Sequence, residues 1–163
     1  MYISPPNPSP DIPLSVQVNL QVAANEIVSR AVEEVGGVDN VEYPFLESGA
    51  ERYVFDMGAF VAKFDFGGAG ANIAEWNAWH EMSFEQRLWF ARPYVRSEDS
   101  RSRIVVMEKL IENPFEDPDF EPLVSQIFQQ EPWMVEFIYD SRWYNWGYRP
   151  GSETPVVLDY GLR

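Results

Sequence analysis

Apolar and polar residues recur along the chain with two different periods, which predict a mixture of helices and strands. From residue 15 onward, apolar side chains come at spacings of three and four, at Leu20, Ala24, Ile27, Ala31 and Val35. This spacing is typical of an amphipathic helix, and the glycine pair at 36–37 predicts its end. Residues 1–14 carry five prolines and no such pattern, so we expect a flexible, extended arm there.

The middle of the chain predicts short antiparallel strands and one helix. The β-like segments VEYPFLES, ERYVFDMG and AFVAKFDF follow one another, and Met57-Gly58 has the composition of a tight turn. ANIAEWNAWHEM, from residue 71, has apolar residues at helical spacing. We expect two more strands, at 90–94 and within RSRIVVMEKL, then a helix from about Phe120 and a final hairpin of WYNWGYR and PVVLDYGL. This order predicts an α+β fold with one helix between the third and fourth strands of an antiparallel sheet.

Composition and charge narrow the classes of protein. The 163 residues fit one domain, and the absence of cysteine excludes disulfides and thiolate metal sites. We expect a cytoplasmic protein, because the chain has neither a signal peptide nor an apolar run of about 18 residues. The net charge of −14 speaks against direct binding to nucleic acid or membranes and favours a basic partner. Such a charge also simply keeps a protein soluble, and the sequence leaves both interpretations open.

Five polar residues are candidates for chemistry. Lys63 lies in the apolar strand segment FVAKFDF, where it either faces outward or pairs with an acid such as Glu75 on the next helix. Asp140, Asn145 and Asp159 offer the oxygen ligands that Mg²⁺ prefers. Spacing alone does not distinguish that site from turns, in which Asp and Asn also gather.

Taken in order, these residues resemble the protein-kinase fold. GAERYVF, the strand lysine of VAKF, the helix glutamate of NIAEWNAW and the segment VVMEKL resemble its small lobe and hinge. The D-x-x-x-x-N spacing of Asp140 and Asn145 resembles its catalytic loop, and Asp159-Tyr160-Gly161 resembles D-F-G. The resemblance covers roughly residues 44–163 and is greatest to small kinase-like proteins of bacteriophages and bacteria. It implies a kinase-like small lobe, a truncated helical part and an additional N-terminal helix.

The resemblance also implies a role for each matched residue. Lys63 would contact the α- and β-phosphates of ATP with Glu75 as its ion-pair partner, and Gly49 would lie in the loop over the phosphates. Met107 and Glu108 would lie beside the adenine. In the same way, Asp140 would accept the proton of the attacking hydroxyl, and Asn145 and Asp159 would hold Mg²⁺.

The sequence departs from the kinase pattern at three places. ESGAERYVF has one glycine, with Arg52 near the position of the last glycine of the loop; Ile138-Tyr139 replaces the usual His-Arg. The sequence ends two residues after Asp159-Tyr160-Gly161, so we expect a core without an activation segment or a substrate platform.

We therefore divide the chain into an arm (1–14), an N-terminal helix (15–37) and a minimal kinase-like domain (38–163), and three functions stay open. The first is a phage-encoded kinase-like protein that binds MgATP and transfers phosphate. The second is a pseudokinase whose acidic surface binds and inhibits a basic, nucleic-acid-handling host protein. The third is an assembly protein whose arm and N-terminal helix dock onto other copies of the chain.

Overall fold

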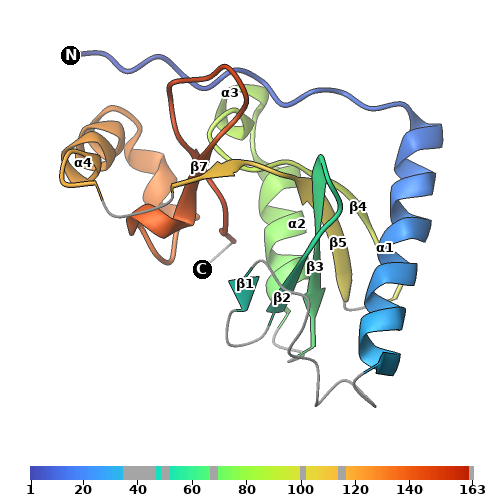
Figure 1. Ribbon diagram of the computed structural model, residues 1–163. Coiled ribbons are helices and arrows are strands. Elements are labelled where there is room, and N and C mark those ends of the chain that lie inside the picture. The colour runs from blue at the N-terminus through green and yellow to red at the C-terminus, as the bar shows by residue number, and fades with distance from the viewer. Residues whose placement is uncertain (35–46, 49–51, 67–69, 100–101, 114–116, 162–163) are drawn as a thin grey trace. The chain divides into compact units, whose positions relative to one another are not determined.

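The computed structural model describes residues 1–34, 47–48, 52–66, 70–99, 102–113 and 117–161 (Figure 1). It confirms an α+β fold with an N-terminal helix. The chain forms two compact units, which we describe separately: unit 1 comprises residues 1–9, 77–92 and 110–163, and unit 2 comprises residues 10–76 and 93–109. Within the described residues, no helix is long and apolar enough to cross a lipid bilayer.

Unit 2 is built on an antiparallel sheet with strand order β1-β2-β3-β5-β4. Because β5 lies between β3 and β4, the chain leaves the sheet after β3, forms the helix α2 and returns at the far edge. The elements are α1 (Leu14–Glu34), β1 (Glu47–Ser48), β2 (Arg52–Asp56), β3 (Phe60–Asp65), the first six residues of α2 (Ala71–Glu81), β4 (Pro93–Arg96) and β5 (Ile104–Glu108).

The core of unit 2 lies between α1 and one face of this sheet (Figure 1). Ala24, Val28 and Ala31 of α1 are small or β-branched, which allows the helix to approach the strands closely. They pack with buried residues of four strands: Phe55, Ala62, Phe64, Tyr94, Val95 and Val106. The predicted helical stripe is therefore the face that α1 buries, except for Val35, which lies outside the described residues.

Strand β3 is covered on both faces, which explains its nearly continuous apolar sequence. Its even-numbered residues Ala62 and Phe64 join the core under α1, whereas Lys63 points to the opposite face. The preceding turn requires Gly58, whose φ of +87° disfavours other residues. Gly58 also donates its backbone N–H to Oδ1 of Asp56, at 2.9 Å. This confirms the predicted turn at Met57-Gly58.

Unit 1 combines short helices with a small antiparallel sheet of order β6-β7-β8. Gly147 is required in β7 because a Cβ there would lie 2.8 Å from Cβ of Leu110. The elements are the end of α2, α3 (Phe84–Arg87), β6 (Ile111–Glu112), α4 (Phe120–Gln130), the 3-10 helices η2 (Pro132–Glu136) and η3 (Trp143–Asn145), β7 (Trp146–Tyr148) and β8 (Val156–Val157).

Aromatic side chains and one arginine organise the interior of unit 1. The ring of Phe90 lies 4.8 Å from that of Tyr160 and 6.0 Å from that of Phe137, and all three are buried. The guanidinium of Arg149 donates hydrogen bonds to the carbonyl oxygens of Asn7, Leu88 and Phe90, at 2.6, 2.7 and 2.9 Å. One buried cation thereby satisfies carbonyls of segments that form no ladder with one another.

Hydrogen bonds join residues 1–9 of the predicted N-terminal arm to the rest of unit 1. The backbone N–H and carbonyl of Ile3 bond to the side-chain amide of Gln130, at 2.8 and 2.7 Å. Ile3 is buried, and the hydroxyl of Thr154 donates to the carbonyl of Ser4, at 2.8 Å. Residues 1–9 thus belong to unit 1 as an extended segment.

Other sequence predictions need adjustment. The strand predicted at 90–94 is found at Pro93–Arg96, because Phe90 instead bridges Val157 and fills the core of unit 1. Of VEYPFLES, the structure describes only Glu47–Ser48, which form β1.

Substituting Arg149 tests the organisation of unit 1. Arg149→Met keeps the length of the side chain but leaves buried carbonyls without a donor, so we expect the free energy of unfolding to fall by at least about 2 kcal/mol. Urea unfolding followed by tryptophan fluorescence measures this, because five of the six tryptophans lie in unit 1. Arg30→Met, at an exposed position of α1, is the control. Equal unfolding midpoints for the two variants would contradict the assigned role.

Candidate functional site

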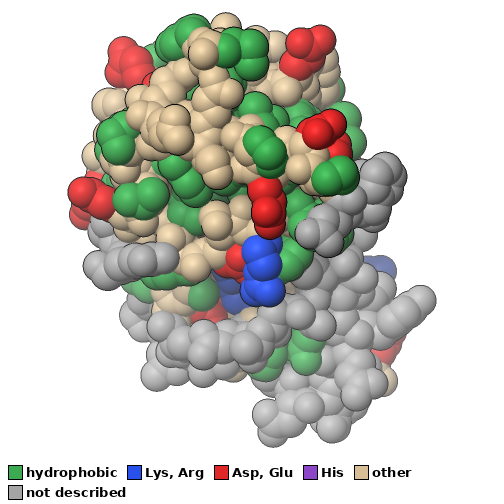
Figure 2. Space-filling model, turned by 90° about the vertical axis from the view of Figure 1, so that its left-hand side faces the viewer, with side chains coloured by type: hydrophobic (Ala, Val, Ile, Leu, Met, Phe, Trp, Pro, Cys, Tyr) green, Lys and Arg blue, Asp and Glu red, His purple; other side chains and the backbone are tan. Residues whose placement is uncertain are grey.

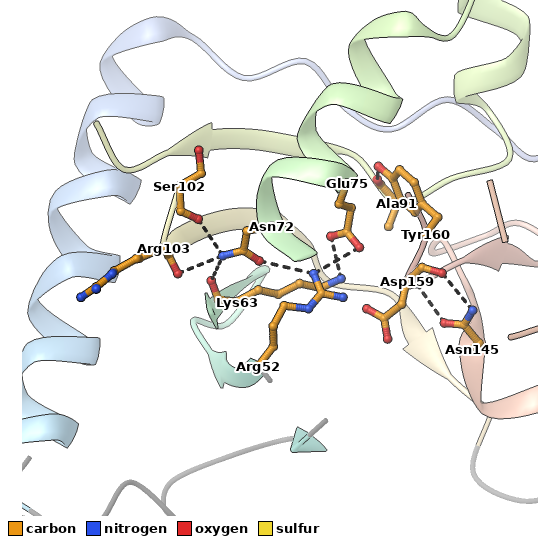
Figure 3. Close-up of polar contacts among 10 residues, drawn as sticks. All are labelled: Arg52, Lys63, Asn72, Glu75, Ala91, Ser102, Arg103, Asn145, Asp159 and Tyr160. Atoms are coloured by element: carbon orange, nitrogen blue, oxygen red, sulfur yellow. Dashed lines mark hydrogen bonds and ion pairs between the residues drawn. The ribbon is translucent and has the colours of Figure 1, made fainter. Parts of the chain in front are cut away.

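The candidate site in unit 2 centres on a buried ion pair between β3 and α2. Nζ of Lys63 lies 2.9 Å from Oε1 of Glu75, and Figure 3 shows the two side chains pointing toward one another. Lys63 is 5% exposed and Glu75 is fully buried. Of the two interpretations of Lys63, the geometry confirms the pairing with Glu75 and excludes an outward-facing lysine.

Arg52 contributes a second cation to Glu75. Its Nη1 lies 3.3 Å from Oε2 of Glu75 and 3.3 Å from Oδ1 of Asn72 (Figure 3). Each oxygen of the carboxylate therefore faces a different positively charged side chain. Because Arg52 comes from β2 and Lys63 from β3, the carboxylate connects both strands of the hairpin to α2.

Asn72 fixes the start of α2 against the sheet. Its Nδ2 lies 2.9 Å from each of three backbone carbonyl oxygens, those of Lys63, Ser102 and Arg103. Asn72 and Ser102 are fully buried, and Ser102 has a positive φ of 49° that is uncommon for a residue other than glycine. The side-chain amide thus supports an unfavourable turn and holds β3 at the point where Lys63 projects.

Burying these charged side chains costs free energy, and this cost points to a functional role. Desolvation of a carboxylate, an ammonium and a guanidinium opposes their mutual attraction, and apolar residues of similar volume often stabilise a fold equally well. Perturbed or buried charges of this kind gather at functional sites. The arrangement holds the side-chain nitrogen of Lys63 in a fixed position beside Glu75.

The remaining predicted nucleotide contacts in unit 2 lie on β5. Met107 and Glu108 are buried, and Met107 pairs with Val61 of β3 while Glu108 pairs with Phe60. They end the strand just before the chain passes from unit 2 to unit 1. Gly49 lies outside the described residues.

In unit 1, two neighbouring side chains bind the carboxylate of Asp140, which is still 33% exposed. Nε and Nη2 of Arg142 donate to its two oxygens at 3.0 and 3.1 Å, and the hydroxyl of Tyr144 donates at 2.7 Å. These contacts, with the Arg142 hydrogen bond as the main cause, lower the pKa of Asp140 from 3.8 to about 2. The same pair raises the pKa of Arg142. A carboxylate of such low basicity is a poor general base at neutral pH.

Asn145 joins the segment of Asp140 to that of Asp159, as Figure 3 shows for the second of these contacts. Its Nδ2 donates to the carbonyl oxygens of Asp140 and Asp159, at 2.6 and 2.9 Å. Its Oδ1 accepts the backbone N–H of Asp159, also at 2.9 Å. The three predicted residues of this unit therefore lie together, but through backbone groups rather than through a ring of metal-facing oxygens.

The fit of a metal ion to these residues is limited. Within the described part of the chain, no three His, Cys, Asp or Glu side chains are grouped so that they could hold a metal. Oδ1 of Asn145 already accepts the backbone N–H of Asp159, so a metal ion would have to share that oxygen and add the carboxylate of Asp159. Mg²⁺ commonly takes one or two protein ligands and completes its octahedron with water and phosphate oxygens, so this pair suits a metal that arrives with a nucleotide.

Sequence reasoning did not assign roles to Arg52, Asn72, Arg142 and Tyr144. Arg52 stood out only as a departure from the glycine pattern, and nothing local marks it as a partner of Glu75, 23 residues later. The contacts of Arg142 and Tyr144 with Asp140 could have been predicted from the local sequence, because both residues follow it within four positions. Asp followed closely by Arg often forms such a hydrogen-bonded turn.

Removing the charge of Glu75 tests the ion-pair cluster. Glu75→Gln keeps the side-chain shape but leaves Lys63 and Arg52 buried without this carboxylate, so we expect a loss of about 3–5 kcal/mol in the free energy of unfolding. Lys109→Ala, which removes the exposed pair of Lys109 with Asp56, is the matched control and should change stability little. Similar urea midpoints for both variants would mean that the buried pair contributes no more than a surface one.

The titration of Asp140 tests its contacts with Arg142 and Tyr144. Because the folded-state pKa lies below the unfolded value, the contribution of Asp140 to stability is present above about pH 4 and is lost as the pH falls toward about 2. We expect a carboxyl ¹³C titration midpoint near 2 in the wild type and a higher midpoint in Arg142→Ala, because the side chain of Arg142 is the main cause of the lowered pKa. Tyr144→Phe, which removes one hydrogen bond, should raise the midpoint less. A wild-type midpoint near 3.8 would exclude these contacts in solution.

In comparisons with known proteins, the sequence matches no protein-family model and no curated protein.

Proposed function

We propose that this chain is a kinase-like protein that binds MgATP through Lys63. The observation that carries the proposal is the buried lysine of β3, held 2.9 Å from a fully buried glutamate of α2. An ammonium fixed in this way suits phosphate oxygens, for which lysine acts as a point charge. Such a pair also positions the phosphate-contacting lysine in protein kinases.

The topology of unit 2 supports the same proposal. The helix between β3 and β4 and the antiparallel strand order match the small lobe that the sequence resemblance implies. In this arrangement Met107 and Glu108 end β5 where the hinge would begin, so their segment would contact the adenine. In unit 1, the resemblance assigns Mg²⁺ to Asp159 and Asn145.

The hydrogen bonds that Arg142 and Tyr144 donate to Asp140 favour nucleotide binding without phosphate transfer. A catalytic base has to accept a proton, yet this carboxylate is held by Arg142 and Tyr144 and has a pKa of about 2. Brønsted behaviour makes so weak a base inefficient at neutral pH. The second function that we propose is therefore a pseudokinase that acts by binding a partner.

For the pseudokinase, the negative net charge favours a basic protein as the partner. The net charge of −14 would accelerate association with a positively charged surface. On the face shown in Figure 2, acidic side chains are separated by apolar and polar ones. The negative net charge attracts a basic surface in general and does not require the regular charge spacing of a nucleic-acid backbone.

Thermal unfolding with and without MgATP tests nucleotide binding. Ligand at about 100 times its Kd adds about 2.7 kcal/mol, which corresponds to roughly 5–10 °C for a chain of this size. We expect this shift in the wild type and in the control Lys109→Met, and its loss in Lys63→Met and Asp159→Asn. No shift in the wild type at millimolar MgATP would overturn the proposal.

Turnover separates the kinase from the pseudokinase. We expect a wild type that binds MgATP to release no phosphate and to label no protein. Phosphate release that disappears in Asp140→Asn would instead assign catalysis to Asp140. A complex with a basic protein that weakens with salt and is unaffected by Lys63→Met would support the pseudokinase function.

A further inference from the structure

Helix α1 carries a second apolar stripe that unit 2 does not bury. Leu14, Val18 and Val22 follow one another at intervals of four residues, which places them on one ridge of the helix. They are 75%, 55% and 54% exposed. The adjoining face of α1, with Ala24 and Val28, packs on the sheet. A surface helix usually needs one apolar face, so the second stripe requires an explanation.

The charge distribution indicates what can cover this stripe. Residues 1–25 contain one charged side chain, Asp11, so the other 25 acidic and all 12 basic residues lie between 26 and 163. The net charge of that remainder is −13 (25 acidic against 12 basic). A second copy of the chain is repelled by such a surface but meets no like charge on the first three turns of α1. A basic partner, in contrast, would gain nothing from this uncharged segment.

A hollow beside the stripe supplies a complementary shape. It measures about 300 Å³ and is lined by Val18, Gln21, Val22 and Asn25 of α1, with Glu98 also at its edge. The four helix positions have the i, i+3, i+4, i+7 spacing of the hole that receives a knob in coiled-coil packing. Leu14 is the largest and most exposed member of the stripe and is the natural knob.

We propose that two copies of this chain associate through α1, antiparallel and about a twofold axis near Val18. This axis brings the two Val18 side chains together and directs Leu14 of each copy toward the hollow beside Val22 of the other. An isologous contact of this kind uses the same patch twice. The proline-rich segment is not required, because residues 1–9 are already bound within unit 1.

The small size of the patch sets the expected affinity. Three turns of helix bury less than the roughly 1,600 Å² of a standard protein interface, so the dimer should dissociate on dilution. This inference does not rest on nucleotide binding, and either can fail without the other.

Sedimentation equilibrium of the full chain tests the dimer. We expect the mass to rise with concentration from 18.8 kDa toward twice that value by about 1 mM. Val18→Glu places two carboxylates at the axis and should keep the chain monomeric. Val135→Glu is the matched control, because Val135 is a similarly exposed valine (48%) beside another apolar hollow, in unit 1, and should leave the dimer intact. Circular dichroism confirms that both variants are folded.

Cysteine cross-linking tests the axis itself, since the chain has no cysteine of its own. Under mild oxidation, Val18→Cys should give a disulfide-linked dimer, and Val135→Cys should give much less. A wild type that remains at 18.8 kDa at every concentration overturns the proposal. So does a dimer that persists in Val18→Glu, or equal cross-linking of the two cysteine variants.

Discussion

The fully buried carboxylate of Glu75 is the constraint on which unit 2 depends. A carboxylate without solvent must be paired, and here Lys63 and Arg52 each face one of its oxygens. Those cations come from adjacent strands, so α2 can reach its place only when the β2–β3 hairpin is in register. Asn72, one turn earlier, adds hydrogen bonds to β3 and to the turn before β5. The site and the helix–sheet packing are therefore one structure, and a change to either affects both.

Unit 1 has few hydrogen bonds between strands, because its strands are only two or three residues long. Ladders this short leave many backbone carbonyls without partners, and buried polar side chains satisfy them instead. Arg149 donates to three carbonyls, and Asn145 donates to the carbonyls of Asp140 and Asp159. The predicted site residues of unit 1 therefore also stabilise its fold through hydrogen bonds.

The two units differ in the contacts that hold their candidate residues, Lys63 in unit 2 and Asp140 in unit 1. Nζ of Lys63 lies 2.9 Å from the carboxylate of Glu75, which fixes its position on β3. Asp140 would first have to lose hydrogen bonds to Arg142 or Tyr144 before it could accept a proton. This asymmetry is the physical reason for proposing nucleotide binding ahead of phosphate transfer.

The sequence by itself determined the features that depend on local chemistry. The period of α1, the glycine turn at Gly58, the start of α4 near Phe120 and the final hairpin all follow from residues close together in the chain. It also gave the Lys63–Glu75 pair as one of two interpretations of Lys63, and the structure decided between them. Only the tertiary structure decided that Arg52 joins this pair, that Phe90 leaves its predicted strand for an aromatic core, and that residues 1–9 are bound. Those outcomes depend on contacts between distant segments, for which hydrophobic period and residue spacing carry no signal.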